Sequence, residues 1–96
     1  MGGMDAIFKA LGDPVRLVIV DELVSRDART LFEIVVVLVT NHGFALSRQA
    51  VSKHLAVLET AGLIHIDRVG RTTVHRLDRR ALASARSWLT ERLESS

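Results

Sequence analysis

Residues 47–54 carry hydrogen-bonding side chains at a spacing that suits contact with nucleic acid. Ser47 is a typical helix N-cap, and Ala50, Val51 and Leu55 follow it at helical spacing, so we expect these apolar residues to face a core. The polar residues between them then point outward. Arginine and lysine can donate to guanine, glutamine can pair with an adenine edge, and serine suits a base or a phosphate oxygen. The predicted DNA contacts on this helix are Ser47, Arg48, Gln49, Ser52, Lys53 and His54.

His54 has an alternative interpretation, since a histidine at the boundary of a core can instead form a hydrogen bond within the protein. Further predicted contacts lie near the tip of an expected hairpin, where side chains can reach phosphates or the minor groove: Arg68, Arg71, Thr72 and Thr73. The distribution of charge supports this placement. The whole chain has a net charge of +2, but residues 47–80 contain seven basic and three acidic residues, a net charge of +4. We therefore expect a polyanion to bind this stretch.

Local signals predict the elements that position these side chains. Asp13 and Pro14 begin a helix over 14–25, because an N-cap carboxylate precedes a proline at the first helical position. Thr30 and Glu33 form a capping box, which favours a helix to about Thr40 even though the β-branched run 34–39 has strand propensity. Helical spacing also predicts terminal helices over 5–11 and 79–93, and the helix that begins after Ser47 ends at Gly62.

Beyond Gly62 the apolar pattern changes to a period of two, which predicts a two-stranded hairpin. We expect Ile64, Ile66 and Val74 on one face, and His65, Asp67, Thr73 and His75 on the other. His65 and His75 are then expected to lie opposite one another, and a weak metal site near Asp67 is the alternative to an exposed polar pair. The predicted fold is mainly α with a β-hairpin wing (α+β), a winged helix-turn-helix. Its helix-turn-helix spans about 30–62 and its wing about 63–77.

Length and composition exclude several classes of protein. With 96 residues, 48% of them hydrophobic, the chain is expected to form a single folded domain over 1–96. It has no cysteine, so neither a disulfide nor a thiolate site is possible. No nucleophile elbow, phosphate loop or HExxH motif is present, so we predict no catalytic residues and no enzyme activity. The start of the chain lacks the pattern of a signal peptide, and no apolar run is long enough to span a membrane. We expect a soluble, cytoplasmic protein with no cofactor.

Three stretches resemble the ArsR/SmtB family of bacterial winged-helix repressors: 8–17, 47–63 and 70–78. The resemblance covers roughly residues 7–89. It implies a homodimer, joined by the first and last helices, that binds a near-palindromic operator on double-stranded DNA through the helix beginning after Ser47 and the wing. The apolar stripes of the terminal helices independently favour a partner. The predicted dimer residues are Ile7, Phe8, Leu11, Leu82, Ala85, Trp88 and Leu89.

The chain departs from this family in two respects. Metal-sensing members have cysteines in the helix before the recognition helix, or Asp and His ligands on the last helix, whereas this chain has 33–37 without cysteine and 78–94 without histidine. We therefore predict no metal site, and the sequence does not identify a small-molecule effector. The span from Glu33 to Ser47 is also several residues longer than the common family pattern. Its valines are expected to be core, with an extra interface or an effector pocket as alternatives. A winged-helix protein-interaction module and a metal-responsive regulator remain the alternative functions.

Overall fold

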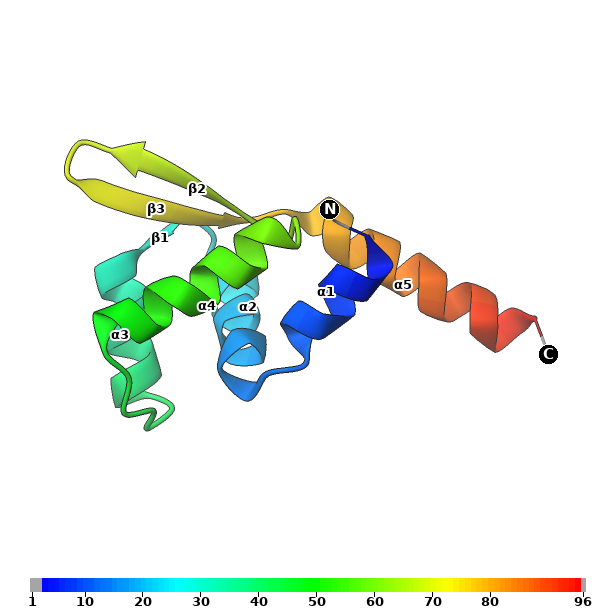
Figure 1. The fold of residues 1–96 in the computed structure, drawn as a ribbon, viewed down its shortest axis with the longest axis horizontal. Helices are drawn as coiled ribbons and strands as arrows, with labels where there is room; N and C mark the ends of the chain where they lie inside the picture. Colours follow the sequence, from blue (N-terminus) through cyan, green and yellow to red (C-terminus); the bar gives the residue numbers. More distant parts are fainter. Residues whose placement is uncertain (1–2, 96) are drawn as a thin grey trace.

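The computed structural model describes residues 3–95, which fold into helices around a small antiparallel sheet (Figure 1). The helices are α1 (Met4–Leu11), α2 (Pro14–Ser25), α3 (Leu31–Thr40), α4 (Arg48–Thr60) and α5 (Arg79–Glu94), and the strands are β1 (Arg29–Thr30), β2 (Ile64–Val69) and β3 (Thr72–Leu77). This order confirms the predicted α+β winged helix-turn-helix. None of the helices in the described part of the chain is long and apolar enough to cross a membrane.

The helix starts form as the sequence predicted. The Asp13 carboxylate accepts hydrogen bonds from the backbone N–H groups of Val15 and Arg16, and Pro14 occupies the first turn of α2. At α3, the Thr30 hydroxyl accepts from the Glu33 N–H while the Glu33 carboxylate accepts from the Thr30 N–H. This reciprocal cap satisfies two backbone donors that a helix start otherwise leaves unpaired. The β-branched run that follows is therefore helical.

The sheet has one strand more than predicted. β1 pairs with β3, and β3 pairs with β2, so the strand order is β1-β3-β2. The prediction of a two-stranded hairpin was therefore incomplete. β1 has only two residues, and the second of them, Thr30, is also the N-cap of α3, so β1 is too short to show an alternating pattern in the sequence. The segment just before β1 is also bonded to the end of β3, since the Asp27 side chain accepts a hydrogen bond from the Leu77 N–H at 3.1 Å.

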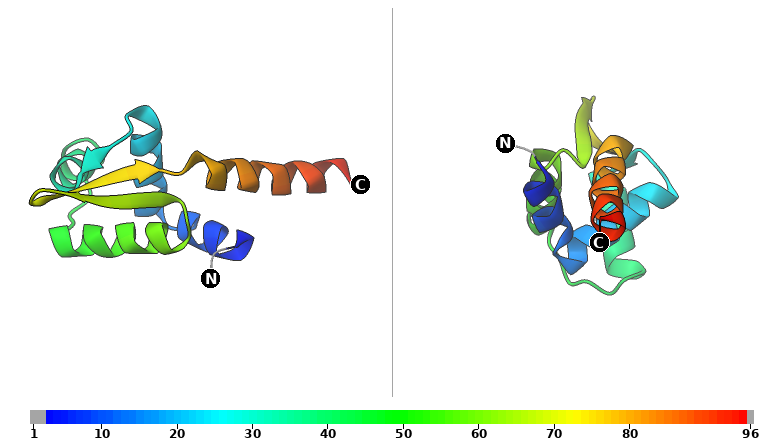
Figure 2. Two further views of the ribbon diagram at one scale, coloured as in Figure 1. Left: turned by 90° about the horizontal axis from the view of Figure 1, so that it is seen from above. Right: turned by 90° about the vertical axis from the view of Figure 1, so that its right-hand side faces the viewer.

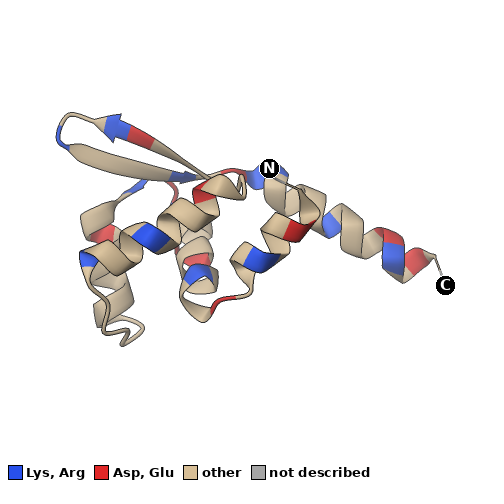
Figure 3. Ribbon diagram, in the orientation of Figure 1, with Lys and Arg blue, Asp and Glu red and all other residues tan. Residues whose placement is uncertain are grey.

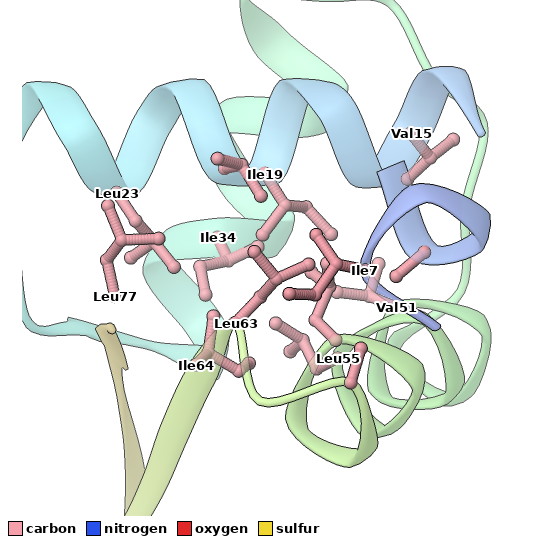
Figure 4. Close-up of a cluster of buried hydrophobic side chains, with 14 of the residues drawn as sticks. Ile7, Val15, Ile19, Leu23, Ile34, Val51, Leu55, Leu63, Ile64 and Leu77 are labelled. Carbon is pink, nitrogen blue, oxygen red and sulfur yellow. The ribbon is translucent and has the colours of Figure 1, made fainter. Parts of the chain in front are cut away.

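The core lies where α2, α3 and α4 meet the base of the hairpin (Figure 4). Ile19 and Leu23 of α2 pack with Ile34 of α3 and Leu55 of α4, and all four are at most 1% exposed. Leu63, which is fully buried, joins α4 to β2. α5 is placed differently. It packs on α1, and its C-terminal part extends beyond the rest of the molecule, as two further views confirm (Figure 2).

The faces of the hairpin differ from the prediction. In the observed register Ile66 lies opposite His75, and His65 lies opposite Arg76. Directly opposed residues share a face, so His75 is on the inner face with Ile66, while Val74 is on the outer face with His65 and Asp67. The expected pairing of His65 with His75 is therefore wrong. The period of two places residues on alternate faces, but the pairing register is decided by the core and by β1.

The buried position of His75 predicts a pH-dependent stability. Its side chain is 2% exposed, and its Nδ1 donates to the Arg29 carbonyl oxygen at 3.1 Å. Burial lowers the pKa of His75 below its ordinary value, although the Arg29 carbonyl and the Glu59 carboxylate oppose this effect. Below about pH 6.5 the unfolded chain takes up a proton that the folded chain resists. Stability from this residue is therefore present at neutral pH and is lost as the pH falls.

We expect His75→Gln to flatten the loss of stability between about pH 7.5 and pH 5.5, where one such proton contributes at most about 1.4 kcal/mol per pH unit. Urea unfolding of both proteins across this range measures the difference. The control is Val69→Gln, which changes an exposed residue of the hairpin that does not titrate. Parallel pH profiles for His75→Gln and the unchanged protein would contradict the assigned role of His75.

Candidate nucleic-acid interface

The N-terminal half of α4 is oriented by its cap and by its buried residues. The Ser47 hydroxyl accepts a hydrogen bond from the Ala50 N–H at 3.1 Å, which starts the helix at Arg48. Val51 and Leu55 are at most 1% exposed, and this inward face fixes the rotation of α4 about its axis. The outward face consists of predicted contact residues that are all exposed: Ser47, Arg48, Gln49, Ser52 and Lys53. This face combines two cations, an amide and hydroxyl groups, which are the groups that read base edges and bind phosphates.

His54 lies apart from this face and is half-buried. Its Nδ1 accepts a hydrogen bond from Nη1 of Arg16 at 3.2 Å, and the Asp13 carboxylate is 3.9 Å away. Arg16 also donates through Nε to the Ala10 carbonyl oxygen at 2.7 Å. These contacts connect the end of α1, the start of α2 and the middle of α4. They support the structural alternative for His54, and its contact with DNA stays a prediction.

The electrostatics of this junction follow from its hydrogen bonds. Partial burial by itself would raise the pKa of Asp13, but the backbone N–H groups of Arg16 and Val15 and the nearby His54 outweigh it and hold that pKa below its ordinary value. The Asp13 side chain is therefore a carboxylate at neutral pH. It both caps α2 and provides a negative charge beside His54, which favours a fixed geometry at the middle of α4.

The wing, which we define as β2, β3 and the turn between them, extends away from the core (Figure 1). Its turn consists of Gly70 and Arg71, and Gly70 has a φ of 63°, a conformation that favours glycine. Arg68, Arg71 and Thr72 are exposed and Thr73 is half-buried. Figure 3 shows basic residues near the wing tip and along α4, at the end of the molecule opposite the end of α5. The fold thus brings the two predicted contact regions to one end.

At its base the wing is joined to α5. The Asp78 carboxylate caps α5 by accepting from the Arg80 N–H, and it also accepts from His65 Nε2 at 2.8 Å. The Arg80 guanidinium, followed by the His65 imidazole, holds the pKa of Asp78 well below its usual range. His65 is therefore occupied by Asp78, while His75 binds the Arg29 carbonyl, and the two histidines do not converge on a shared metal position.

The terminal helices pack on each other within the chain. The rings of Phe8 in α1 and Trp88 in α5 are 5.3 Å apart in an edge-on arrangement, and the Arg92 guanidinium lies 4.0 Å from the Trp88 ring centre. Two of the predicted dimer residues, Ile7 and Ala85, are 6% and 7% exposed and have little surface left for a partner. Phe8, Leu11, Leu82 and Trp88 are half-buried, and Leu89 is 48% exposed.

Comparison with known proteins identifies the family. A family model described as a helix-turn-helix domain matches residues 11–67. An uncharacterized HTH-type transcriptional regulator of Bacillus subtilis, YuzN, is 49% identical over 73 residues, which are 76% of this chain and 79% of that protein. The chain belongs to the ArsR-like winged helix-turn-helix transcriptional regulators.

Solved structures agree with this assignment. The crystal structure of an ArsR family transcriptional regulator superposes on this chain with a TM-score of 0.80. The two are 26% identical, and the match covers 98% of this chain and 94% of the other. An ArsR-like transcriptional regulator from Rhodococcus gives a TM-score of 0.72, at 31% identity over 92% of this chain and 76% of the other. The family is one of transcriptional regulators with a DNA-binding domain and not of enzymes, as the sequence predicted.

The long α3–α4 connection of the ArsR-like chain is an ordered loop. α3 ends at Thr40, and the loop continues to Ser47 with Phe44 and Leu46 partly buried against the core. His42 Nε2 donates to the Glu22 carboxylate of α2 at 3.1 Å, and the same carboxylate binds Arg29 at 3.1 Å. The valines of α3 divide between two environments. Val37 is buried, whereas Val36 and Val39 are 39% and 45% exposed, so only part of the run is core.

Two residues of the ArsR-like site were missed from the sequence. Arg16 positions α4 through His54, but its partners lie on other helices, so no local pattern indicates it. Phe32 is 67% exposed beside the start of α4 and the wing. The capping box fixes Phe32 in the first turn of α3, and a helical projection from Thr30 would place it away from Ile34 and Leu38. That signal was present in the sequence.

Proposed function

We propose that this regulator is a homodimeric repressor that blocks a promoter by occupying a near-palindromic operator. In each subunit α4 enters the major groove, and the wing contacts phosphates or the minor groove beside it. The observation that carries this proposal is that the start of α4, whose polar residues are exposed, and the tip of the wing lie at the same end of the molecule (Figure 3). This arrangement suits a recognition helix with a flanking wing on a duplex.

The chemistry of α4 supports direct reading of bases. Gln49, Ser52 and Lys53 recur at the spacing of one helix face and are exposed, so they can reach neighbouring base edges together. The free N–H groups at the start of the helix favour a phosphate nearby. The net charge of +4 over residues 47–80 adds long-range attraction to DNA. We propose the predicted contact residues of α4 and the wing other than His54 as the DNA surface. His54, which is bonded to Arg16, instead positions α4.

The shape of α5 supports the dimer. The helix has 16 residues, yet Ala85 is its only buried residue in the described part of the chain. Leu89 and Leu93 are 48% and 81% exposed on the part that extends beyond the body of the molecule. Helices are stabilised mainly by packing of an apolar face, so this stripe favours a second copy related by a two-fold axis. Such symmetry matches two half-sites on DNA.

The proposed location follows from the proposed target. The B. subtilis relative is a bacterial HTH-type transcriptional regulator. A bacterial repressor meets its operator on chromosomal DNA, so we propose that this chain acts in the bacterial cytoplasm.

A titration of the purified protein on labelled duplexes tests the proposal. Fluorescence anisotropy with DNA from the region upstream of its own coding sequence, at several salt concentrations, is expected to give saturable binding that weakens steeply with salt. A scrambled duplex of equal length measures the non-specific part. Transcription in vitro from the bound promoter then distinguishes a repressor from an activator. A protein that shows no salt-dependent DNA binding would overturn the proposed function.

The role of Gln49 in sequence reading predicts a change in specificity. We expect Gln49→Ala to cost about 1–3 kcal/mol on the preferred operator and to relax the preference at one base pair, because a paired base edge loses its partner. Affinity for single-base operator variants measures both effects. Thr90→Ala, an exposed position on α5, is the control. An unchanged ranking of operator variants would exclude Gln49 from base reading.

A further inference from the structure

A cleft of about 270 Å³ separates the start of α3, the start of α4 and the tip of the wing. The residues that line it come from three parts of the sequence: Thr30, Leu31, Phe32, Arg48, Arg71, Thr72 and Thr73. These segments meet at the end of the molecule opposite the end of α5 (Figure 1). The cleft therefore lies within the region that we propose to contact DNA, and it joins the recognition helix to the wing.

The charge of the cleft is one-sided. Arg48 and Arg71 both line it, and none of its lining residues is acidic. Within residues 3–95 neither arginine forms an ion pair or a side-chain hydrogen bond, unlike Arg26, Arg29 and Arg80. Two guanidinium groups that share a cleft without a counter-charge favour an anion with several acceptor oxygens. The hydroxyl groups of Thr72 and Thr73 add neutral donors on the same side.

Phe32 gives the cleft an apolar wall. Its side chain is 67% exposed, although it belongs to a helix whose Ile34 and Leu38 are fully buried. A free phosphate ion would satisfy the arginines but would leave this ring in water. A nucleic-acid backbone offers both chemistries, since each charged phosphodiester is followed by a deoxyribose with an apolar face. The ring and the arginines are thus matched by one ligand.

We propose that this cleft holds the sugar–phosphate backbone of one DNA strand, with Arg48 and Arg71 on phosphate oxygens and Phe32 packed against a deoxyribose. The inference rests on the proposed function and makes it more specific. It assigns Arg48 to the backbone, where the sequence suggested a guanine edge, and it adds Phe32 as a DNA contact. Because one strand is held by α3, α4 and the wing together, the cleft sets the depth at which α4 enters the groove.

Substitution of Phe32 tests the apolar half of the cleft. We expect Phe32→Ala to weaken operator binding about tenfold, because the ring loses the surface that it buries on the sugar. The slope of log affinity against log salt should not change, since phenylalanine carries no charge. Phe32→Leu should retain part of the affinity. Val36→Ala is the matched control, because Val36 is an exposed apolar residue one turn further along α3. Equal urea unfolding curves confirm that the variants are folded.

The two arginines are tested by coupling to single phosphates. Arg48→Gln is expected to weaken binding at all sequences and to reduce the salt slope by about one, as is Arg71→Gln. Duplexes in which one phosphate at a time is replaced by a neutral methylphosphonate should then reveal positions at which the unchanged protein loses affinity. At one or two adjacent positions, the methylphosphonate should cost no further affinity in Arg48→Gln or in Arg71→Gln. A double-mutant cycle between each arginine and each phosphate measures this coupling.

The outcomes separate the cleft from the proposed function. If the unchanged protein binds its operator but Phe32→Ala binds equally well, or if the two arginines couple to no common stretch of backbone, the cleft proposal is wrong and the function stands. If inorganic phosphate displaces the operator more strongly than chloride at equal ionic strength, with Arg48→Gln abolishing that difference, the cleft is a free-anion site and the proposal is overturned. If the unchanged protein does not bind DNA at all, the proposed function itself fails.

Discussion

Replacing Leu89 and Leu93 together with glutamate is expected to convert the proposed dimer into monomers and to weaken operator binding about a hundredfold or more. Both leucines lie on α5 where it extends beyond the body of the molecule, and they are 48% and 81% exposed. Charged residues at these positions would have to be buried without partners in a dimer interface. A monomer then holds one half-site at a time and loses the gain from binding two half-sites together.

Light scattering or sedimentation measures the mass of the protein, and anisotropy titration measures its affinity for an operator with two half-sites. The control adds the same charges at Ala83 and Ser87, which are exposed on other faces of α5. We expect this control to remain dimeric. If Leu89→Glu with Leu93→Glu stays dimeric and keeps its affinity, α5 does not form the proposed interface. If it becomes monomeric and still binds with full affinity, the dimer is not required for DNA binding.

Ile34→Ala is expected to destabilise the protein by about 2–5 kcal/mol, because it removes a fully buried side chain and leaves a cavity between α2, α3 and α4. Domains of this size have only about 5–15 kcal/mol of stability in total, so this is a large share. Val36→Ala is the comparison. Val36 is a β-branched residue on the same helix but is 39% exposed, and its replacement should cost less than about 1 kcal/mol.

Urea unfolding at one fixed protein concentration measures both variants, because dimerisation makes the apparent stability depend on concentration. The comparison also tests the rotation of α3 about its axis. If Val36→Ala costs as much as Ile34→Ala, the outward face of α3 is covered by a contact that the chain by itself does not make. Equal and small effects of both changes would contradict the placement of Ile34 in the core.

Caps account for how well the helices were predicted. The bonds from Asp13, Thr30 and Ser47 to the backbone span two or three residues, so the residue types and their spacing are enough to locate each helix start. The rotation of α4 follows in the same way from Val51 and Leu55. The exposure of Arg48, Gln49, Ser52 and Lys53 was therefore foreseeable before any tertiary contact was known, whereas their contact with DNA stays a prediction.

The hairpin shows where such reasoning stops. A period of two assigns residues to alternate faces, but it does not decide how the strands are paired. His75 is polar and was expected outside with His65, yet it is buried because β1 arrives from a distant part of the sequence and offers it the Arg29 carbonyl. Burying histidine is tolerable only with such a partner. The partner is separated from it by 46 residues, so no local pattern could reveal it.

The sequence by itself determined the fold class, the starts of the helices, the polar face of α4 and the concentration of positive charge in residues 47–80. These features depend on hydrogen bonds and periodicities within a few neighbouring residues. Only the tertiary structure decided that Arg48, Arg71 and Phe32 line one cleft. It also decided that Arg16 forms a hydrogen bond with His54, and that Ile7 and Ala85 are buried in the core of the chain itself. The physical reason is that each of these contacts joins separate elements, whose relative positions are set by packing of the whole core.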